Sequence, residues 1–271
     1  MHAAATPPSA PEPARATEPR KVAIALRGVS IGYGERAIVE GIDLDILAGE
    51  ILFIGGGSGC GKTTLLSSLN TLRPPLSGSI VIDGIEIAGA DEDALQQVRR
   101  RFGMMYQLGA LFGGMTLLEN VRLPLEEFTA LPRDAMEDLA RAKLGLVGLA
   151  AHADKKPAEI SGGMQKRAAI ARALALDPPI IFLDEPSAGL DPVTSADLDA
   201  LIVALNRMLG TTFVVISHEL ASIFAIGHRF AMLDGARRRM VALGPPAELR
   251  DRSDDPWVRR FLTRTASGDH G

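Results

Sequence analysis

The feature that most constrains this chain is a glycine-rich stretch from residue 56 to residue 64, which matches the pattern G-x-x-x-x-G-K-[ST]. Glycines allow such a loop to fold with its backbone N–H groups pointing inward at an anion. A helix that begins near Gly61 would add its dipole and its free N–H groups. The sequence therefore predicts a P-loop, which binds the phosphates of a nucleotide. The loop residues expected to hold that nucleotide are Gly56, Gly57, Ser58, Gly59, Cys60, Gly61, Lys62, Thr63 and Thr64.

Two side chains of the loop have the chemistry that nucleotide binding needs. Lys62 is expected to reach the β- and γ-phosphates, and the hydroxyl of Thr63 is expected to ligate Mg²⁺. An accidental glycine-rich turn is the alternative interpretation. The flanking sequence argues against it, because an apolar run of buried-strand type (51–54) precedes the loop and leucines at helical spacing follow it. Strand, loop and helix in this order are the context that the motif requires.

The composition limits the classes of partner. The 271 residues are enough for one large domain or for a domain with an inserted subdomain, and 46% of them are hydrophobic. The net charge of −4 argues against nucleic acid as the main partner, so the arginine triplets 99–101 and 237–239 are interpreted as solvated faces. The single cysteine excludes an internal disulfide and suits a reducing compartment. No apolar run approaches the roughly 18 residues of a membrane span.

Alternating apolar residues predict strands in the segment 22–54. Tyr33 lies in a turn between two of these runs, where its ring could stack on adenine; taken alone, it is more simply a packed surface aromatic. An apolar strand at 80–82 ends in the hairpin signal Asp83-Gly84. An amphipathic helix at 91–101 and a short strand at 102–106 then lead to Gln107.

Helical patterns dominate from residue 108 to residue 176, which indicates a helical insertion in an α/β core. The expected helices span 116–123, 133–149 and 161–176. Ser161, Gly162 and Gly163 open the last of them. A serine and two glycines at a helix start can bind an anion, although a helix cap is the better interpretation of these residues in isolation.

Two further strands of buried type end in polar residues. The apolar run 180–183 is typical of a parallel sheet and ends in Asp184 and Glu185. Adjacent carboxylates are costly there without a counter-charge. A strand-end turn would explain them, but beside a P-loop an Asp for the Mg²⁺ shell and a Glu for the attacking water is the better explanation. The strand 212–216 ends at Ser217 and His218, at the same predicted edge.

A helix with Asp191 as its N-cap is expected to end before Gly210, and a hairpin is expected at 230–243. Residues 245–271 are interpreted as a short helical tail. Residues 1–20 are rich in Ala and Pro and lack the apolar stretch of a signal peptide, so a disordered tail is expected.

Together these motifs resemble the ATP-binding-cassette (ABC) ATPases over roughly residues 22–250. The resemblance rests on the P-loop, on Gln107, on Ser161-Gly162-Gly163 upstream of Asp184-Glu185, and on His218. It implies an α/β fold with a P-loop NTPase (RecA-like) core, an N-terminal antiparallel β-subdomain and an inserted α-helical subdomain. The ATPase domain would then span 21–250, with the helical subdomain at about 108–176 and a C-terminal tail at 251–271.

The resemblance also implies a role for each matching residue. In that family the match to Tyr33 stacks on adenine, and the match to Gln107 senses Mg²⁺ and the γ-phosphate. Asp184 would hold Mg²⁺ through water, Glu185 would be the general base, and His218 would contact the γ-phosphate. The implied cofactors are ATP and Mg²⁺, and the implied reaction is hydrolysis of ATP. The implied catalytic residues are Lys62, Gln107, Glu185 and His218. The implied metal site comprises Thr63, Gln107 and Asp184. Ser161, Gly162 and Gly163 would bind the nucleotide of a second copy.

Three short stretches are similar to the Mla/Mce-type lipid-transport ATPases within that family. They are residues 106–112, the Ser-Gly-Gly-Met at 161–164 and the Asp-Pro-Trp-Val-Arg-Arg-Phe-Leu at 255–262. This similarity implies a lipid cargo, a transmembrane permease, a homodimer of ATPase subunits, a lipid-binding Mce-type partner and a peripheral location on the cytoplasmic side of the inner membrane. An importer ATPase for a soluble solute remains an alternative.

A non-transport ATPase acting on DNA or ribosomes is a second alternative. The sequence disfavours this alternative, because it shows neither a long coiled coil between the P-loop and Ser161-Gly162-Gly163 nor a second cassette. A binding module without turnover is disfavoured by Glu185 and His218. One further expectation concerns Cys60, which lies beside Lys62 and near a helix N-terminus. Both neighbours lower a thiol pKa, so Cys60 would be reactive and protected by ATP, whereas an inert small residue is the alternative.

Overall fold

A six-stranded sheet forms the centre of the computed structural model, which describes residues 21–264. Its strand order is β10-β9-β3-β8-β7-β6. All strands except β10 are parallel, and β10 pairs antiparallel with β9. The residues that follow β3, β7 and β8 therefore meet at one edge of the sheet, as expected for a parallel sheet. The strands are β3 (Ile51–Gly56), β6 (Phe102–Met105), β7 (Ile180–Asp184), β8 (Thr212–Ile216), β9 (Arg229–Asp234) and β10 (Arg239–Gly244).

The central strands are buried on both faces. In β3, Ile51 and Phe53 belong to one apolar cluster, while Leu52 and Ile54 belong to another. This alternation follows from the period of two of a β-strand, whose successive side chains point to opposite faces. The continuous apolar runs seen in the sequence are therefore explained by two cores, one on each side of the sheet.

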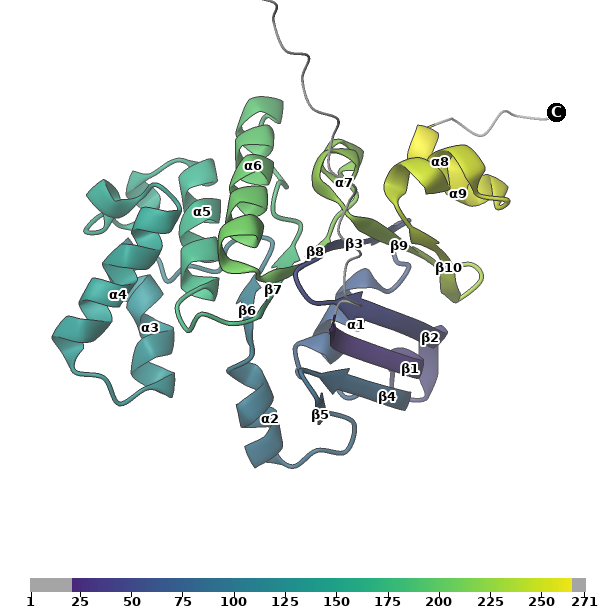
Figure 1. The fold of residues 1–271 in the computed structure, drawn as a ribbon, viewed down its shortest axis with the longest axis horizontal. Coiled ribbons are helices and arrows are strands. Elements are labelled where there is room, and N and C mark those ends of the chain that lie inside the picture. The colour runs from purple at the N-terminus through teal and green to yellow at the C-terminus, as the bar shows by residue number, and fades with distance from the viewer. Residues whose placement is uncertain (1–20, 265–271) are drawn as a thin grey trace, which may run out of the picture.

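A second, antiparallel sheet covers one of these cores (Figure 1). It has the order β2-β1-β4-β5, formed by β1 (Val22–Tyr33), β2 (Arg36–Leu47), β4 (Ser77–Ile82) and β5 (Ile85–Glu86). The expected hairpin at Asp83-Gly84 is confirmed, since Ile82 pairs with Ile85. Helix α1 (Lys62–Leu69) contributes its leucines to the same cluster, so the P-loop helix is held between the two sheets.

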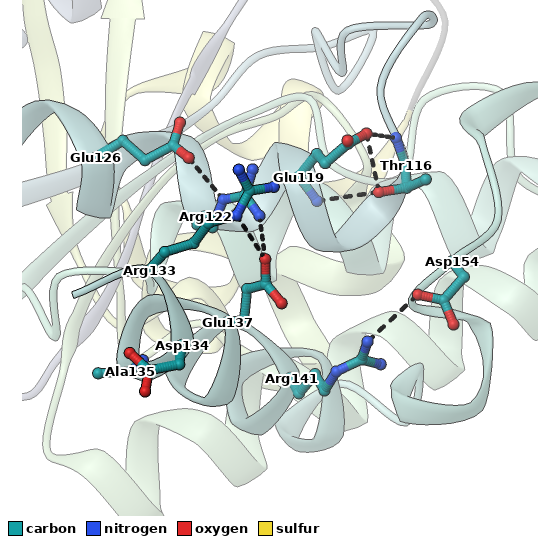
Figure 2. Close-up of polar contacts among 10 residues, drawn as sticks. All are labelled: Thr116, Glu119, Arg122, Glu126, Arg133, Asp134, Ala135, Glu137, Arg141 and Asp154. Atoms are coloured by element: carbon teal, nitrogen blue, oxygen red, sulfur yellow. Dashed lines mark hydrogen bonds and ion pairs between the residues drawn. The ribbon is translucent and has the colours of Figure 1, made fainter. Parts of the chain in front are cut away.

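Helices α3 (Leu117–Phe128), α4 (Arg133–Leu146) and α5 (Gly162–Ala173) lie on the opposite side of the molecule from the antiparallel sheet (Figure 1). Figure 2 shows the ion pairs within and between α3 and α4. The almost fully buried Arg122 donates to Glu126 at 2.6 Å and to Glu137 at 2.7 Å, and Arg133 donates to Glu137 at 3.0 Å. Thr116 and Glu119 form a capping box at the start of α3. Such a box satisfies N–H groups that a helix start would otherwise leave free.

The boundaries of these helices differ from the sequence expectation. Helix α3 continues through Pro124 to Phe128 instead of ending at residue 123. The next turn places Leu125 in the core at 2% exposure, and this burial favours extension despite the proline. Helix α4 ends at Leu146 and not at residue 149, because Gly148 adopts the left-handed conformation that stops a helix.

The remaining α-helices lie before β6 or after β7 in the chain. The helix expected at 91–101 is α2 (Glu92–Arg99), with Asp91 as its N-cap and its end two residues earlier than expected. Asp191 and the left-handed Gly210 bound α6 (Pro192–Leu209) as expected. Helix α7 (Leu220–Ile226) was not expected from the sequence. The tail forms α8 (Pro246–Arg252) and α9 (Pro256–Thr263). The expected disorder of 1–20 lies outside the described residues. Across residues 21–264, no helix combines the length and apolarity needed to cross a membrane.

Candidate functional site

The P-loop joins β3 to α1 and depends on glycine at both of its ends. Gly56 has a φ of 142°, and a Cβ there would lie 2.2 Å from the carbonyl oxygen of Leu233. Gly61, the N-cap of α1, has a φ of 98°, and its Cβ would lie 2.7 Å from Val39. Any other residue would therefore meet both a strained backbone and a steric clash. The glycines place the loop against β2 and β9, with the first turn of α1 behind it.

The loop forms one wall of a cavity of about 530 Å³. Lys62 extends over the loop, and its Nζ donates to the carbonyl oxygens of Gly56 and Gly57 at 3.1 Å each. Residues after β6, β7 and β8 line the cavity at the carboxyl edge of the sheet. The predicted site residues that line it are Gly56, Gly57, Ser58, Gly59, Lys62, Thr63, Gln107, Asp184, Glu185 and His218.

Glu185 follows β7 with a φ of 46°, a conformation that is strained for a residue with a side chain. Its backbone N–H donates to the carbonyl of Ile216 at 2.8 Å, which ties it to the end of β8. Its carboxylate lies 2.8 Å from Nδ1 of His218 and accepts a hydrogen bond from Ser217 at 3.4 Å. The strained turn thus holds a carboxylate and an imidazole together in the cavity.

Burial, followed by the negative charge of Glu185, raises the pKa of Asp184, and the charges of Lys166 and Lys62 oppose this rise. The cavity offers the Asp184 carboxylate, the Thr63 hydroxyl and the Gln107 amide, which are the hard oxygen ligands that Mg²⁺ prefers. Among the described residues, no cluster of three or more His, Cys, Asp or Glu side chains could hold a metal alone. This donor set therefore fits a Mg²⁺ ion that is also held by phosphate oxygens.

Two basic residues of α5 hold the segment that follows β6, and neither was expected from the sequence. Lys166 is buried and donates to the main-chain carbonyl of Gln107. Arg172 donates to the carbonyls of Gly109 at 2.9 Å and Ala110 at 2.7 Å. Their positions depend on how α5 packs beside β6, so spacing along the chain could not reveal them.

Tyr33 lies outside this cavity, beside a neighbouring hollow of about 460 Å³ that shares Gly59 with it. The ring is 54% exposed, and the guanidinium of Arg73 stacks on it at 4.4 Å from the ring centroid. Its hydroxyl accepts a hydrogen bond from Thr64 at 3.4 Å. The ring of Tyr33 is thus half-exposed and fixed beside the P-loop, where a flat group could stack on it.

The start of α5 is separate from the P-loop cavity. Ser161 accepts a hydrogen bond from the backbone N–H of Met164 at 3.2 Å, so its predicted role as N-cap is confirmed. Ser161 and Gly162 are exposed. Gly163 is buried against Thr194 of α6, where a Cβ would approach a methyl group to 2.5 Å. Ser161 and Gly163 line a different hollow of about 260 Å³.

The expectation that Cys60 has a lowered thiol pKa is wrong. Its side chain is 1% exposed, and burial raises the pKa of the thiol although the neighbouring charge of Lys62 opposes the rise. A buried thiol with a raised pKa has little thiolate at neutral pH. Cys60 is therefore a packing residue on the buried side of the P-loop, in contact with the backbone around Gly56 and Gly235.

One wall of the cavity comes from the C-terminal tail. Phe261 of α9 lines the cavity and stacks on Phe230 of β9, with ring centroids 6.2 Å apart and ring planes 11° apart. The neighbouring Val258 and Leu262 are buried and anchor α9. The stretch 255–262 was notable in the sequence only as a resemblance, and its contact with the nucleotide cavity was not expected.

The family model described as "ABC transporter" matches residues 39–188. The chain belongs to the ABC transporter family. The probable ribonucleotide transport ATP-binding protein mkl of Mycobacterium leprae is 42% identical over 93% of this chain and 72% of its own length. The intermembrane phospholipid transport system ATP-binding protein MlaF of Escherichia coli (strain K12) is 41% identical over 90% of this chain and 89% of its own length.

A solved dimeric ATP-binding cassette in a post-hydrolysis state, bound to ADP and Pi, has a similar fold. Its TM-score is 0.73 at 33% sequence identity, over 82% of this chain and 98% of that one. The expected fold class is therefore confirmed, and this ABC subunit is an ATPase that binds ATP. The helical segment that the sequence analysis expected after Gln107 is the one that carries α3, α4 and α5.

Proposed function

We propose that this ABC subunit hydrolyses ATP to drive phospholipid transport by a membrane permease. The observation that carries the hydrolytic part is the single cavity that unites the P-loop with Gln107, Asp184, Glu185 and His218. The phospholipid part is supported by the similarity to MlaF, whose name assigns that protein to intermembrane phospholipid transport. The match covers 90% of this chain and 89% of MlaF, so it spans the cavity residues from the P-loop to His218.

In this proposal each residue of the cavity has one task. The P-loop N–H groups and Lys62 bind the phosphates and stabilise the negative charge that shifts during transfer of the γ-phosphoryl group. Glu185 accepts the proton of the attacking water, and His218, 2.8 Å from it, contacts the γ-phosphate. Tyr33 stacks on adenine. Thr63, Gln107 and Asp184 would hold Mg²⁺, which neutralises phosphate charge when bound.

The partners in this proposal follow from exposed surfaces. Leu108 is 89% exposed and Phe112 is 53% exposed in the segment after Gln107, next to the helices α3 and α5. Apolar side chains this exposed favour contact with another protein. We assign this segment to the permease, which would hold the ATPase on the cytoplasmic side of the inner membrane. A lipid-binding Mce-type protein would complete the complex, and two copies of this chain would form its ATPase pair.

The cargo can be tested in the complex of this chain with its membrane subunit. We expect purified complex to contain phospholipid, and its ATPase rate to change when it is moved from detergent into phospholipid vesicles. The same complex with Glu185→Gln is the control that attributes hydrolysis to this chain. An ATPase that responds to ribonucleotides or another soluble solute, and not to phospholipid, would contradict the proposal. That outcome would favour the transport class named for the mycobacterial relatives.

A further inference from the structure

The outer part of the P-loop depends on neighbouring groups for its order. It consists of Gly57, Ser58 and Gly59, of which Ser58 and Gly59 are exposed. Glycine loses more backbone freedom on ordering than any other residue, so a glycine-rich stretch is costly to fix in one conformation. Cys60 anchors the end of this stretch on its buried side, where Gly235 packs closely against it. The beginning of the stretch, at Gly57, needs a contact of its own.

Helix α9 supplies this contact. A Cβ placed on Gly57 would lie 3.9 Å from Cζ2 of Trp257, so the six-membered ring of the indole lies beside this glycine. Within residues 21–264, and apart from the two chain neighbours of Gly57, no other heavy atom comes within 4 Å of that position. The indole of Trp257 is therefore the neighbour that limits where Gly57 can move on this side.

The indole is placed there at a cost. Its Nε1 is buried and has no hydrogen-bond partner among the residues that the structure describes. A buried donor without a partner destabilises a fold, and a buried tryptophan N–H usually has one. Nε1 and Cζ2 are bonded to the same ring carbon, so the unpaired N–H belongs to the edge of the indole that lies beside Gly57. Packing, and not hydrogen bonding of the N–H, therefore determines where the ring lies.

Contacts at both ends of α9 hold the indole in this position. The N-cap Asp255 accepts a hydrogen bond from the backbone N–H of Trp257 at 2.9 Å and forms an ion pair with Arg237, in the turn after β9. One turn further along α9, Phe261 stacks on Phe230 of β9 and lines the nucleotide cavity. The ring centroids of Trp257 and Phe261 are 6.3 Å apart. The helix is thus fixed to β9 on either side of the indole.

We propose that α9 is part of the nucleotide site and that Trp257 is a positioning residue for the P-loop. The indole holds Gly57 so that the N–H groups of the loop are already aimed when the phosphates arrive. This proposal rests on the proposed nucleotide site, because Trp257 is not among the residues that line the cavity and acts through the loop. A loop that is ordered beforehand subtracts less ordering entropy from the free energy of binding.

The experiment compares Trp257→Phe with the unaltered full-length chain. Phenylalanine keeps an aromatic ring on α9 but lacks the ring atom that lies beside Gly57. We expect a fluorescent ATP analogue to bind about tenfold more weakly in the presence of Mg²⁺, since fixing the backbone of one residue costs a free energy of about this size. The single-turnover rate at saturating ATP should be unchanged, as expected for a group that contributes equally to binding of substrate and transition state. Trp257→Leu is the second variant if the phenylalanine variant does not fold.

Val258→Ala is the matched control on the same helix. Val258 is fully buried, follows Trp257 in the chain and does not line the cavity. Its truncation removes buried methyl groups, so it should lower the midpoint of thermal unfolding. The indole remains beside Gly57 in this variant, so the affinity for the analogue should stay close to that of the unaltered chain.

Three results would overturn the inference. The first is an unchanged affinity in both folded variants of Trp257. The second is an equal loss of affinity in Val258→Ala, which would attribute the effect to the stability of α9 and not to the indole. The third is a slower single-turnover rate at unchanged affinity. Failure of the proposed nucleotide site is distinguishable, because Lys62→Ala would then bind the analogue as tightly as the unaltered chain does.

Discussion

Glu185 combines a strained backbone with a carboxylate aimed into the nucleotide cavity. Strain of this kind persists only where the surrounding structure enforces it, and it is common where a side chain must be aimed. Glutamine has the same shape and makes the same turn, but it cannot accept a proton. We expect Glu185→Gln to bind Mg-ATP with unchanged affinity and to hydrolyse it at least about a hundredfold more slowly.

The measurement is single-turnover hydrolysis with nucleotide binding measured in parallel. Glu219→Gln is the control, because this carboxylate is nearby at the start of α7 and is not part of the cavity lining. The control should hydrolyse ATP at close to the unaltered rate. Hydrolysis by Glu185→Gln at a similar rate would remove Glu185 from the role of general base.

Residues whose role depends on a continuous motif could be predicted from the sequence. The P-loop, Asp184 and Glu185 belong to this group, because a strand and the residues just after it are neighbours in sequence and in space. Lys166 and Phe261 could not be predicted, since only the packing of α5 and α9 brings them to the site. The prediction of a lowered thiol pKa for Cys60 was wrong, because the sequence shows the charged neighbour Lys62 but does not show burial.

The same division applies to whole elements. The continuous apolar runs of β3, β7 and β8 placed these strands correctly, because a strand buried on both faces of a sheet is apolar at nearly every position. The predicted length of α3 was wrong. Pro124 is a helix stop signal in the sequence, whereas the burial of Leu125, which favours a longer helix, depends on tertiary packing. Helix α7 has only seven residues, so it is too short for a helical spacing of apolar residues to be recognised in the sequence.

The pairing of α3 with α4 depends on Arg122, which two carboxylates neutralise (Figure 2). The hydrogen bond from Arg133, and then the charges of Arg122, Arg133 and Arg141, lower the pKa of Glu137 below its ordinary value of 4.5. A carboxyl group with a lowered pKa in the folded state stabilises the fold at pH values above 4.5. This stabilisation is lost as the pH falls through the lower, folded-state pKa.

We therefore expect Glu137→Gln to lower the midpoint of thermal unfolding by a few degrees at neutral pH, because it leaves Arg122 with one carboxylate. The difference from the unaltered chain should shrink as the pH falls below 4.5. Glu127→Gln, an exposed neighbour on α3, is the matched control and should have no effect at any pH. A difference that stays constant as the pH falls would show that the charge of Glu137 does not hold the helices together.

At the scale of the whole molecule, the separation of the P-loop cavity from the start of α5 has a consequence for assembly. The cavity is lined by one set of residues, and Ser161 and Gly163 line another hollow. The exposed helix start offers N–H groups and a hydroxyl to an anion, but within one copy it lies outside the cavity. A head-to-tail pair would bring each helix start to the nucleotide of the other copy, and a solved cassette of similar fold is dimeric.

This arrangement predicts complementation between two inactive variants. Lys62→Ala removes the phosphate-binding lysine, and Ser161→Arg places a long side chain at the helix start that would face the other copy. Each variant alone forms only incomplete sites. A mixed pair has one site in which the intact P-loop of the Ser161→Arg chain meets the intact helix start of the Lys62→Ala chain, so about a quarter of all sites should be complete after random pairing. Nucleotide trapping in a Glu185→Gln background measures this fraction without turnover. Trapping in the mixture and in neither variant alone supports the paired site, whereas full trapping by Ser161→Arg on its own would reduce Ser161 to a helix cap and contradict the dimer.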